Sequence, residues 1–258
     1  MKIKTDNYEI YKGDCLEAMK SIPDKSIDMI LCDLPYGTTR NKWDTVIDLD
    51  LLWSQYERII KDNGAIVLFA QTPFDKVLGC SNLRLLRYEW IWDKKLGTGH
   101  LNSKKMPMKR HENILVFYKK LPTYNPQMTK GDPYDKGVVH GKSSNYGKQR
   151  EVVDKNVTGE RYPTSIIEHT NANRQNRLHP TQKPISLLID LIRTYTNENE
   201  VVLDNTMGSG STGVACMLTD RKFIGIELDD KYFEISKSRL NEAVEKKEEL
   251  LKVFDKNN

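Results

Sequence analysis

The chain has 258 residues, of which 38% are hydrophobic and 29% charged, and its formal net charge is +4 at pH 7. This length suits one large domain, or one domain with a sizeable insertion, and the mild positive charge permits a polyanionic partner without requiring one. No apolar run approaches the roughly 20 residues that cross a bilayer, and the first residues lack the apolar core of a signal peptide. The cysteines are widely spaced (Cys15, Cys32, Cys80 and Cys216), which predicts buried free thiols in a cytosolic protein without disulfides or a zinc site.

The first third of the chain alternates strand-like and helix-like segments. Residues 27–32 form an apolar run typical of a buried strand, residues 51–60 carry apolar side chains at helical spacing, and residues 65–70 again suit a buried strand. Residues 88–92 and 114–118 are further candidate strands. This alternation predicts a mostly parallel sheet that is covered by helices on both faces.

The strand at residues 27–32 leads into an acidic turn, Asp33-Leu34-Pro35-Tyr36. A carboxylate, a main-chain carbonyl and an aromatic ring at adjacent positions can hold a flat molecule that carries an amino group. The acid and the carbonyl accept its two N–H bonds, and the ring stacks on its face. An ordinary strand that ends in a proline turn explains the same four residues.

The segment at residues 119–178 differs in composition, with few aliphatic residues and many Gly, Asn, Lys and Pro. A structureless connection of this length is unusual inside a compact domain, so we expect it to be functional or disordered. Within it, Lys142, Tyr146, Lys148 and Arg150 combine cations with an aromatic ring. That combination suits phosphate contacts and base stacking, although a solvated loop has a similar composition.

The alternating pattern resumes at Pro184, which a first helical turn tolerates. Apolar residues at i, i+3, i+4 and i+7 from Leu188 predict a helix there. The next predicted elements are, in chain order, a strand at 201–203 ending at Asp204, a helix at 212–218, a strand at 223–226 ending at Glu227, and a last helix from about Asp230.

Residues 203–213 form a glycine loop of the pattern G-x-G-x-x-G, between a predicted strand and a predicted helix. Glu227 closes the next strand, where a carboxylate can accept hydrogen bonds from ribose hydroxyls. Asp204 would oppose a pyrophosphate at this helix start, but it suits a ligand with an ammonium group such as S-adenosylmethionine. No Gly-Lys-Ser/Thr follows the glycines, which argues against a nucleoside triphosphate.

Only one clear strand follows the glycine loop, so the N-terminal strands must complete its sheet. Asp33 and Asp204 would then lie along one carboxyl edge, which is where open α/β sheets bind ligands.

Several segments together resemble the amino-methyltransferases of DNA, in the motif order called the β class. They are Asp33–Tyr36, His179–Pro184 and Asp204–Gly213, with Gly13-Asp14-Cys15 and His111–Lys119 as further similar segments. The resemblance implies a Rossmann-like, doubly wound, mostly parallel α/β sheet with permuted motif order. It also implies a catalytic half at residues 1–118, a target-recognition insertion at 119–178 and a cofactor-binding half at 179–258.

The same resemblance implies S-adenosylmethionine as cofactor and double-stranded DNA as partner, with no required metal and no membrane. Members of the family are often dimers, so the chain is expected to form a homodimer in the same way. Asp33 and the Leu34 carbonyl would hold the target amino group, while Pro35 stiffens the turn and Tyr36 stacks on the base. Two departures stand out: Leu34 replaces a usual proline, and Asn205-Thr206 replaces a usual Pro-Phe.

Further residues take roles from the resemblance. Glu227 would bind the ribose, Asp14 the adenine amino group, and Lys183 or Thr181 the carboxylate of the cofactor. The complete set of expected cofactor contacts is Asp14, Cys15, Asp33, Thr181, Lys183, Asp204, Thr206, Gly208, Ser209, Gly210, Ser211, Thr212 and Glu227. From charge and composition, and not from the resemblance, the expected DNA contacts are Lys104, Lys105, Lys142, Tyr146, Lys148 and Arg150, and a solvated loop explains either group of residues as well.

The implied reaction is methyl transfer to the exocyclic N6 of adenine, on a base flipped out of the duplex. Transfer to N4 of cytosine is chemically close, but cytosine members of the family more often carry serine in place of Asp33. Methylation of the cytosine ring carbon needs a cysteine nucleophile in a Pro-Cys pair, which the chain lacks. A nicotinamide-dependent oxidoreductase would leave the acidic turn unused, and a non-catalytic DNA-binding module would make the two acid-ended strands coincidental.

Overall fold

The computed structural model describes residues 1–37, 45–139, 152–170 and 182–256. The chain divides into two compact units, one formed by residues 1–125 and 165–258 and the other by Pro126–Thr164. Five residues with expected contacts lie outside the described parts: Lys142, Tyr146, Lys148, Arg150 and Thr181.

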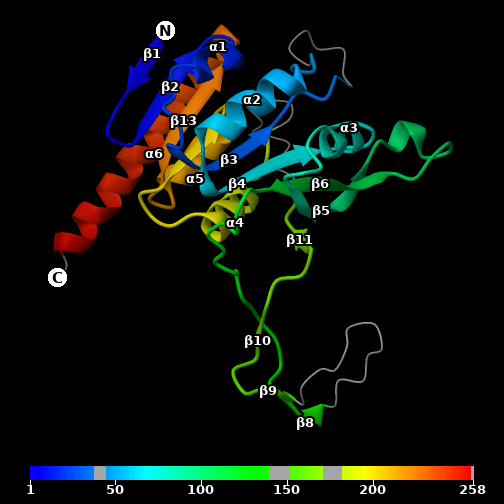
Figure 1. Ribbon diagram of the computed structural model, residues 1–258. Helices are drawn as coiled ribbons and strands as arrows, with labels where there is room; N and C mark the ends of the chain where they lie inside the picture. Colours follow the sequence, from blue (N-terminus) through cyan, green and yellow to red (C-terminus); the bar gives the residue numbers. More distant parts are fainter. Residues whose placement is uncertain (38–44, 140–151, 171–181, 257–258) are drawn as a thin grey trace. The chain divides into compact units, whose positions relative to one another are not determined.

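The larger unit is built on a nine-stranded sheet (Figure 1). Its spatial order is β1 (Lys2–Lys4), β2 (Tyr8–Lys12), β13 (Lys222–Glu227), β12 (Val201–Asp204), β3 (Ile27–Asp33), β4 (Ile60–Ala70), β6 (Lys109–Phe117), β5 (Leu86–Thr98) and β11 (Ile166–Glu168). The strands from β2 to β4 are parallel, whereas β6 is antiparallel to both of its neighbours and β1 is antiparallel to β2. The predicted doubly wound, mostly parallel sheet is confirmed.

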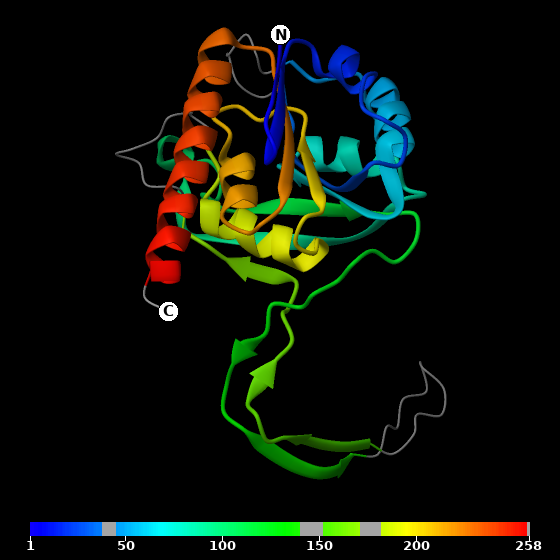
Figure 2. The ribbon, with the colours of Figure 1, turned by 90° about the vertical axis from the view of Figure 1, so that its left-hand side faces the viewer.

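Helices cover both faces of this sheet (Figure 2). One face packs against α1 (Cys15–Met19), α2 (Leu49–Ile59) and α3 (Phe74–Ser81), and the other against α4 (Ile185–Tyr195), α5 (Ser211–Met217) and α6 (Asp230–Lys256). A short 3₁₀ turn, η1 (His100–Asn102), lies between β5 and β6. None of the described helices has both the length and the apolar character that crossing a bilayer requires.

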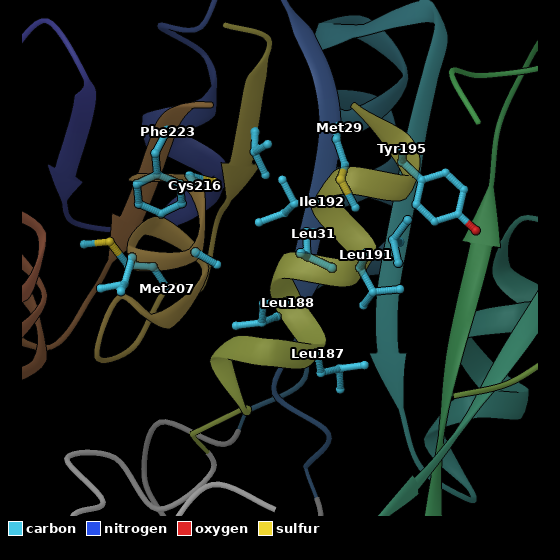
Figure 3. Close-up of a cluster of buried hydrophobic side chains, with 14 of the residues drawn as sticks. Met29, Leu31, Leu187, Leu188, Leu191, Ile192, Tyr195, Met207, Cys216 and Phe223 are labelled. Atoms are coloured by element: carbon cyan, nitrogen blue, oxygen red, sulfur yellow. The ribbon is translucent and has the colours of Figure 1, made fainter. Parts of the chain in front are cut away.

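The central strand β3 shows why its sequence is an unbroken apolar run. Met29 and Leu31 contribute to the core beneath α4 and α5, while Ile30 and Cys32 point to the core beneath α2. All four are at most 1% exposed. Figure 3 shows Met29 and Leu31 gathered with leucines of α4 in one cluster. A strand between two helical layers must be apolar on both faces, which removes the alternation seen in half-exposed strands.

The smaller unit, Pro126–Thr164, contains two short antiparallel pairs. They are β7 (Thr129–Lys130) with β10 (Glu160–Arg161), and β8 (Tyr134–Val139) with β9 (Val152–Asn156). The ring of Tyr134 lies between two cations: the Lys136 ammonium is 4.6 Å and the Arg161 guanidinium 4.8 Å from its centroid. These strands are short and polar, so they carry no apolar alternation for sequence analysis to detect.

Candidate active site

The site is built where the chain reverses its direction of winding across the sheet. From β3 the chain crosses through α2 to β4, and from β12 it crosses through α5 to β13 on the opposite side. Because β3 and β12 are parallel neighbours, their last residues, Asp33 and Asp204, lie at one carboxyl edge. This is the topological switch point at which open α/β sheets bind ligands.

Asp204 is a buried carboxylate, only 4% exposed. Its Oδ1 accepts the main-chain N–H of Thr206 at 3.1 Å, and its Oδ2 accepts the Thr212 hydroxyl at 2.7 Å. No lysine or arginine in the described residues forms an ion pair with it, and burial raises the pKa of Asp204 to about 7. A cationic ligand group at this position would favour the ionised form.

The glycines after Asp204 let the main chain turn tightly into α5. Gly208 and Gly210 have φ angles of 51° and 76°, in the left-handed region. A side chain at Gly210 would also bring its Cβ to 2.9 Å from the Cβ of Ser236 on α6. Position 210 therefore requires glycine both for its backbone conformation and for the close approach of α6.

Glu227 lies beside this loop at the end of β13. Its two carboxylate oxygens accept the N–H groups of Gly208 and Asp229, each at 2.8 Å, and each oxygen keeps lone-pair capacity for a hydroxyl donor. Burial raises the pKa of Glu227. The main-chain N–H of Gly13 donates to the Glu227 carbonyl at 2.9 Å, which brings the turn that carries Asp14 to the same edge.

Asp14 itself is the N-cap of α1 and accepts the main-chain N–H of Glu17 at 3.1 Å. Its neighbour Cys15 is buried. Ser209 and Ser211 are both buried, and their hydroxyls lie 3.0 and 3.2 Å from a guanidinium nitrogen of Arg239 on α6. Sequence analysis missed Arg239, because a lone arginine in a highly charged helix gives no signal.

The acidic turn is held from several sides. The Tyr36 hydroxyl lies 2.7 Å from Asp33 Oδ1, and its ring stacks on Phe74 with centroids 5.2 Å apart. The Leu34 side chain is 3% exposed and belongs to the core beneath α2. The Asp33 carbonyl accepts the Thr206 hydroxyl at 3.1 Å, so the turn and the glycine loop are directly bonded.

Two charged residues that sequence analysis did not assign complete this site. Glu112 on β6 is 4% exposed, and its Oε1 lies 3.0 Å from the Lys183 ammonium and 2.8 Å from the Tyr36 hydroxyl. Its Oε2 lies 2.7 Å from the ammonium of Lys94 on β5. The Lys183 ammonium also lies 2.6 Å from Asp33 Oδ2. We call Asp33, Glu112, Lys94 and Lys183 the charge cluster.

A family model for DNA methylases of the N6 and N4 type matches residues 27–238, which is most of the chain. The chain belongs to this family. It is 29% identical to the DNA adenine methyltransferase YhdJ of Escherichia coli, over 95% of this chain and 86% of that protein. It is 27% identical to the type II methyltransferase M2.MboI of Moraxella bovis, over 92% of this chain and 88% of that protein.

Solved structures agree with this assignment. The complex of M1.HpyAVI with S-adenosylmethionine superposes with a TM-score of 0.64 and 25% identity, covering 91% of this chain and 99% of that one. The cytosine-N4-specific PvuII DNA methyltransferase shares the fold, with a TM-score of 0.65 at 17% identity over 92% of this chain and 87% of that one. The chain is therefore a DNA methyltransferase, and S-adenosylmethionine is its methyl donor.

The residues of the methylase fit this cofactor. S-adenosylmethionine carries an ammonium group and two ribose hydroxyls. The buried carboxylate of Asp204, which has hydrogen-bond donors but no ion pair among the described residues, is a partner for the first, and the remaining lone pairs of Glu227 are partners for the others. The individual contacts expected from the sequence stay predictions.

The substitution of Asn205-Thr206 for the usual Pro-Phe is accommodated by polar contacts. The Asn205 Oδ1 accepts the Tyr56 hydroxyl of α2 at 2.5 Å and the Cys32 thiol of β3 at 2.8 Å. The Asn205 Nδ2 has no partner in the described part of the chain, although it is buried. The two residues thus tie the glycine loop to α2, β3 and the acidic turn.

Other expectations have simpler outcomes. Lys104 and Lys105 are exposed in the connection between η1 and β6. This connection leaves the sheet beside the carboxyl end of β4, where Asn113 of β6 pairs with Ala70, so it belongs to the edge that holds the site.

The expectation of four buried thiols was wrong for Cys80, which is exposed near the end of α3.

Proposed function

We propose that this methylase transfers the methyl group of S-adenosylmethionine to N6 of adenine in double-stranded DNA. The observation that carries the proposal is a carboxylate, Asp33, at the end of β3, in a turn whose main chain is hydrogen-bonded to the glycine loop through Thr206. Cytosine members of the family more often carry serine at the position of Asp33.

The chemical problem is the adenine amino nitrogen, whose lone pair is delocalised into the ring. S-adenosylmethionine supplies an electrophilic methyl group on a sulfonium. Asp33 and the carbonyl of Leu34 accept the two N–H bonds of the amine, which favours a pyramidal nitrogen whose lone pair points towards that methyl group. The nitrogen gains the methyl group and releases one proton to solvent, and the sulfonium becomes a neutral thioether.

The contribution of the protein is therefore orientation and electrostatics, without a covalent intermediate. Tyr36 takes part of the stacking that the flipped base loses on leaving the duplex. One face of its ring is covered by Phe74, so the base stacks on the other face. Asp204 binds the ammonium group of the cofactor, Glu227 its ribose and Asp14 its adenine amino group.

DNA is held by positive side chains from two separate parts of the chain. Lys104 and Lys105 contact phosphates, and Lys142, Tyr146, Lys148 and Arg150 supply contacts from the recognition segment. We assign target recognition to the insertion at residues 119–178, most of which lies in the unit Pro126–Thr164. The segments before and after it form the catalytic and cofactor-binding halves.

The product nucleoside tests the proposal. Plasmid DNA from an unmethylated host is incubated with the protein and methyl-labelled S-adenosylmethionine, then digested to nucleosides and analysed by mass spectrometry. N6-methyl-2′-deoxyadenosine as the labelled product supports the proposal, and N4-methyl-2′-deoxycytidine as the labelled product contradicts it.

A further inference from the structure

A lysine is shared between two buried carboxylates beside the target-binding turn. The Lys183 ammonium lies 2.6 Å from Asp33 Oδ2 and 3.0 Å from Glu112 Oε1. It also lies 4.9 Å from the centroid of the Phe69 ring. The lysine side chain is 10% exposed, so its charge is balanced by protein groups and little by water.

A second lysine holds the far side of Glu112. The Lys94 ammonium lies 2.7 Å from Glu112 Oε2, with side-chain exposures of 8% and 4%, and packs 4.9 Å from the centroid of the Trp92 ring. The charge cluster thus contains two acids and two bases and is neutral as a whole. Removing one member leaves an uncompensated buried charge.

Burial and the neighbouring acids drive Asp33 towards the protonated form, while the hydrogen bond from the Tyr36 hydroxyl favours the ionised form. Burial raises the pKa of Asp33, and the negative charge of Glu112 raises it further, while Lys183 acts in the opposite direction. Asp204 is a second acid on the neighbouring strand. Tyr36 and Thr206 bond to the turn as neutral hydroxyls. Among the described residues, Lys183 is the one cation in contact with Asp33.

Ionisation of Asp33 decides whether the turn can accept the target amine. A carboxylate accepts hydrogen bonds at both oxygens, whereas a protonated carboxyl presents a donor to the amine. Because each carboxylate oxygen has two lone pairs, Oδ2 can keep its bond to Lys183 and still accept a ligand N–H.

We propose that Lys183 is a positioning residue that holds Asp33 ionised and oriented towards the target amine, and that Glu112, anchored by Lys94, holds Lys183 in place. This inference rests on the proposed function in one respect, that Asp33 accepts an N–H of the target base. It gives Lys183 a role at the methyl acceptor, in place of the predicted contact with the carboxylate of the cofactor.

Glu112 also limits how strongly Lys183 pairs with Asp33. The ammonium divides its hydrogen bonds between two acids, which leaves electron density on Asp33 for the amine. Burial alone would raise the pKa of Glu112, but Lys183 and Lys94 outweigh it and lower the pKa to about 2. Glu112 is therefore held in the ionised form by two cations, whereas Asp33 contacts one cation among the described residues.

The test is the pH dependence of single-turnover methyl transfer at saturating S-adenosylmethionine and DNA. The acid limb of the profile is its low-pH side, where the rate falls as Asp33 becomes protonated. In Lys183→Gln, Asp33 loses its cation, so this limb moves to higher pH. We expect the ratio of mutant to wild-type rates to be lower at pH 6 than at pH 9, by at most about tenfold for each pH unit that the limb moves, because one pH unit below the pKa is a tenfold change in the ionised fraction. Lys183→Arg keeps the charge and leaves the acid limb close to that of the wild type.

Glu112→Gln should move the acid limb in the opposite direction. Lys183 then pairs with Asp33 alone and the acid-raising charge of Glu112 is gone, so the limb moves to lower pH. The plateau rate falls because Asp33 is a poorer acceptor. A merely structural role for the cluster predicts lower rates with an unchanged limb in both variants. This second variant keeps the test decisive even if Lys183→Gln folds poorly.

Lys61→Gln is the matched control, because Lys61 pairs with Asp28 at the other end of β3 at the same 2.6 Å distance. Its profile should coincide with that of the wild type. Unchanged acid limbs in Lys183→Gln and Glu112→Gln would overturn the inference. If Lys183→Gln also bound S-adenosylmethionine more weakly, Lys183 would instead contact the carboxylate of the cofactor, as the resemblance implied. A cytosine product from the wild type would contradict the proposed function alone, since the limb shifts do not depend on which base is methylated.

Discussion

The hydroxyl of Thr206 donates a hydrogen bond of 3.1 Å to the main-chain carbonyl of Asp33. The two residues are 173 positions apart in the sequence, one in the glycine loop and one in the acidic turn. In the proposed site, their contact couples the position of the methyl donor to the position of the target amine. We therefore expect the reactive geometry to depend on this bond, together with the bonds of Asn205 to Cys32 and Tyr56.

Removing this bond should slow methyl transfer more than it weakens cofactor binding. We expect Thr206→Val to lower the single-turnover rate about 2- to 10-fold, which corresponds to the loss of one hydrogen bond of about 0.5–1.5 kcal/mol. Thr5→Val, which removes a part-buried hydroxyl bond to the Tyr8 carbonyl, is the control and should keep the wild-type rate. An unchanged rate in Thr206→Val would show that the bond does not set the reactive geometry.

The acidic turn should be intolerant at Asp33 and tolerant at Leu34. Asp33→Asn keeps the shape of the side chain but replaces one acceptor oxygen with an NH2 donor. We therefore expect a loss of about 10²-fold or more in single-turnover rate. Leu34→Met keeps both the carbonyl and a buried apolar side chain, and such swaps usually cost less than about 1.5 kcal/mol of stability. Its rate should stay within about threefold of the wild type. A large loss in Leu34→Met with an unchanged melting temperature would mean that the leucine side chain itself contacts the substrate.

Cofactor binding should release a proton near neutral pH. The folded pKa of Asp204 is about 7 and its ordinary value is 3.8. S-adenosylmethionine, through its ammonium group, favours the ionised carboxylate. Affinity should therefore rise as the pH increases through 7. Calorimetry in buffers of different ionisation enthalpy measures this proton directly, and the release should be absent in Asp204→Asn.

The same shift has a consequence for the unliganded protein. A carboxyl group whose pKa is raised on folding destabilises the folded state as pH rises from the unfolded to the folded pKa, here from about 4 to about 7. Above pH 7, Asp204→Asn should therefore be more stable than the wild type without cofactor, by an amount on the order of a few kcal/mol at most. Urea unfolding at pH 5 and pH 8 measures the difference, which should be larger at pH 8. A stability gap independent of pH would contradict this account of Asp204.

The exposed lysines between η1 and β6 should contribute to affinity for DNA without regard to sequence. Replacing both Lys104 and Lys105 with glutamine should reduce the slope of log K against log salt by about 2, because each phosphate contact contributes about 0.9. Lys246→Gln on the distant end of α6, where Lys246 pairs with Glu242, is the control. Fluorescence anisotropy on specific and nonspecific duplexes measures both slopes, and equal slopes for the variant and the wild type would exclude phosphate contacts at these lysines.

The sequence predicted those elements whose burial leaves a strong periodic signal. The apolar run of β3, the helical spacing of α4 and the strand–glycine–helix order around Asp204 were sufficient to place Asp33 and Asp204 on one edge. Strands β1 and β2 and helices α1 and α3 were not predicted, because charged residues interrupt the apolar pattern in each of them. The antiparallel direction of β6 was not predicted either, since periodicity does not encode strand direction.

The charge cluster could not be found by the same means. Lys94 lies on β5, Glu112 on β6 and Lys183 in the loop before α4, and a single charged residue in such a position is usually solvated. The only available signal for Glu112 was that it lies in a segment similar to the family. That similarity identified the segment, but it did not identify the lysines with which Glu112 pairs. These buried charges meet because of the order of the strands in the sheet, in which β6 lies next to both β4 and β5.

The central claim is that Asp33 directs methyl transfer to the amino group of adenine. The most direct measurement is mass spectrometry of nucleosides from DNA that the wild type and Asp33→Asn have treated with methyl-labelled S-adenosylmethionine. The account predicts labelled N6-methyl-2′-deoxyadenosine from the wild type and a loss of at least about 10²-fold with the variant. Labelled N4-methyl-2′-deoxycytidine from the wild type, or an undiminished yield from Asp33→Asn, would contradict it.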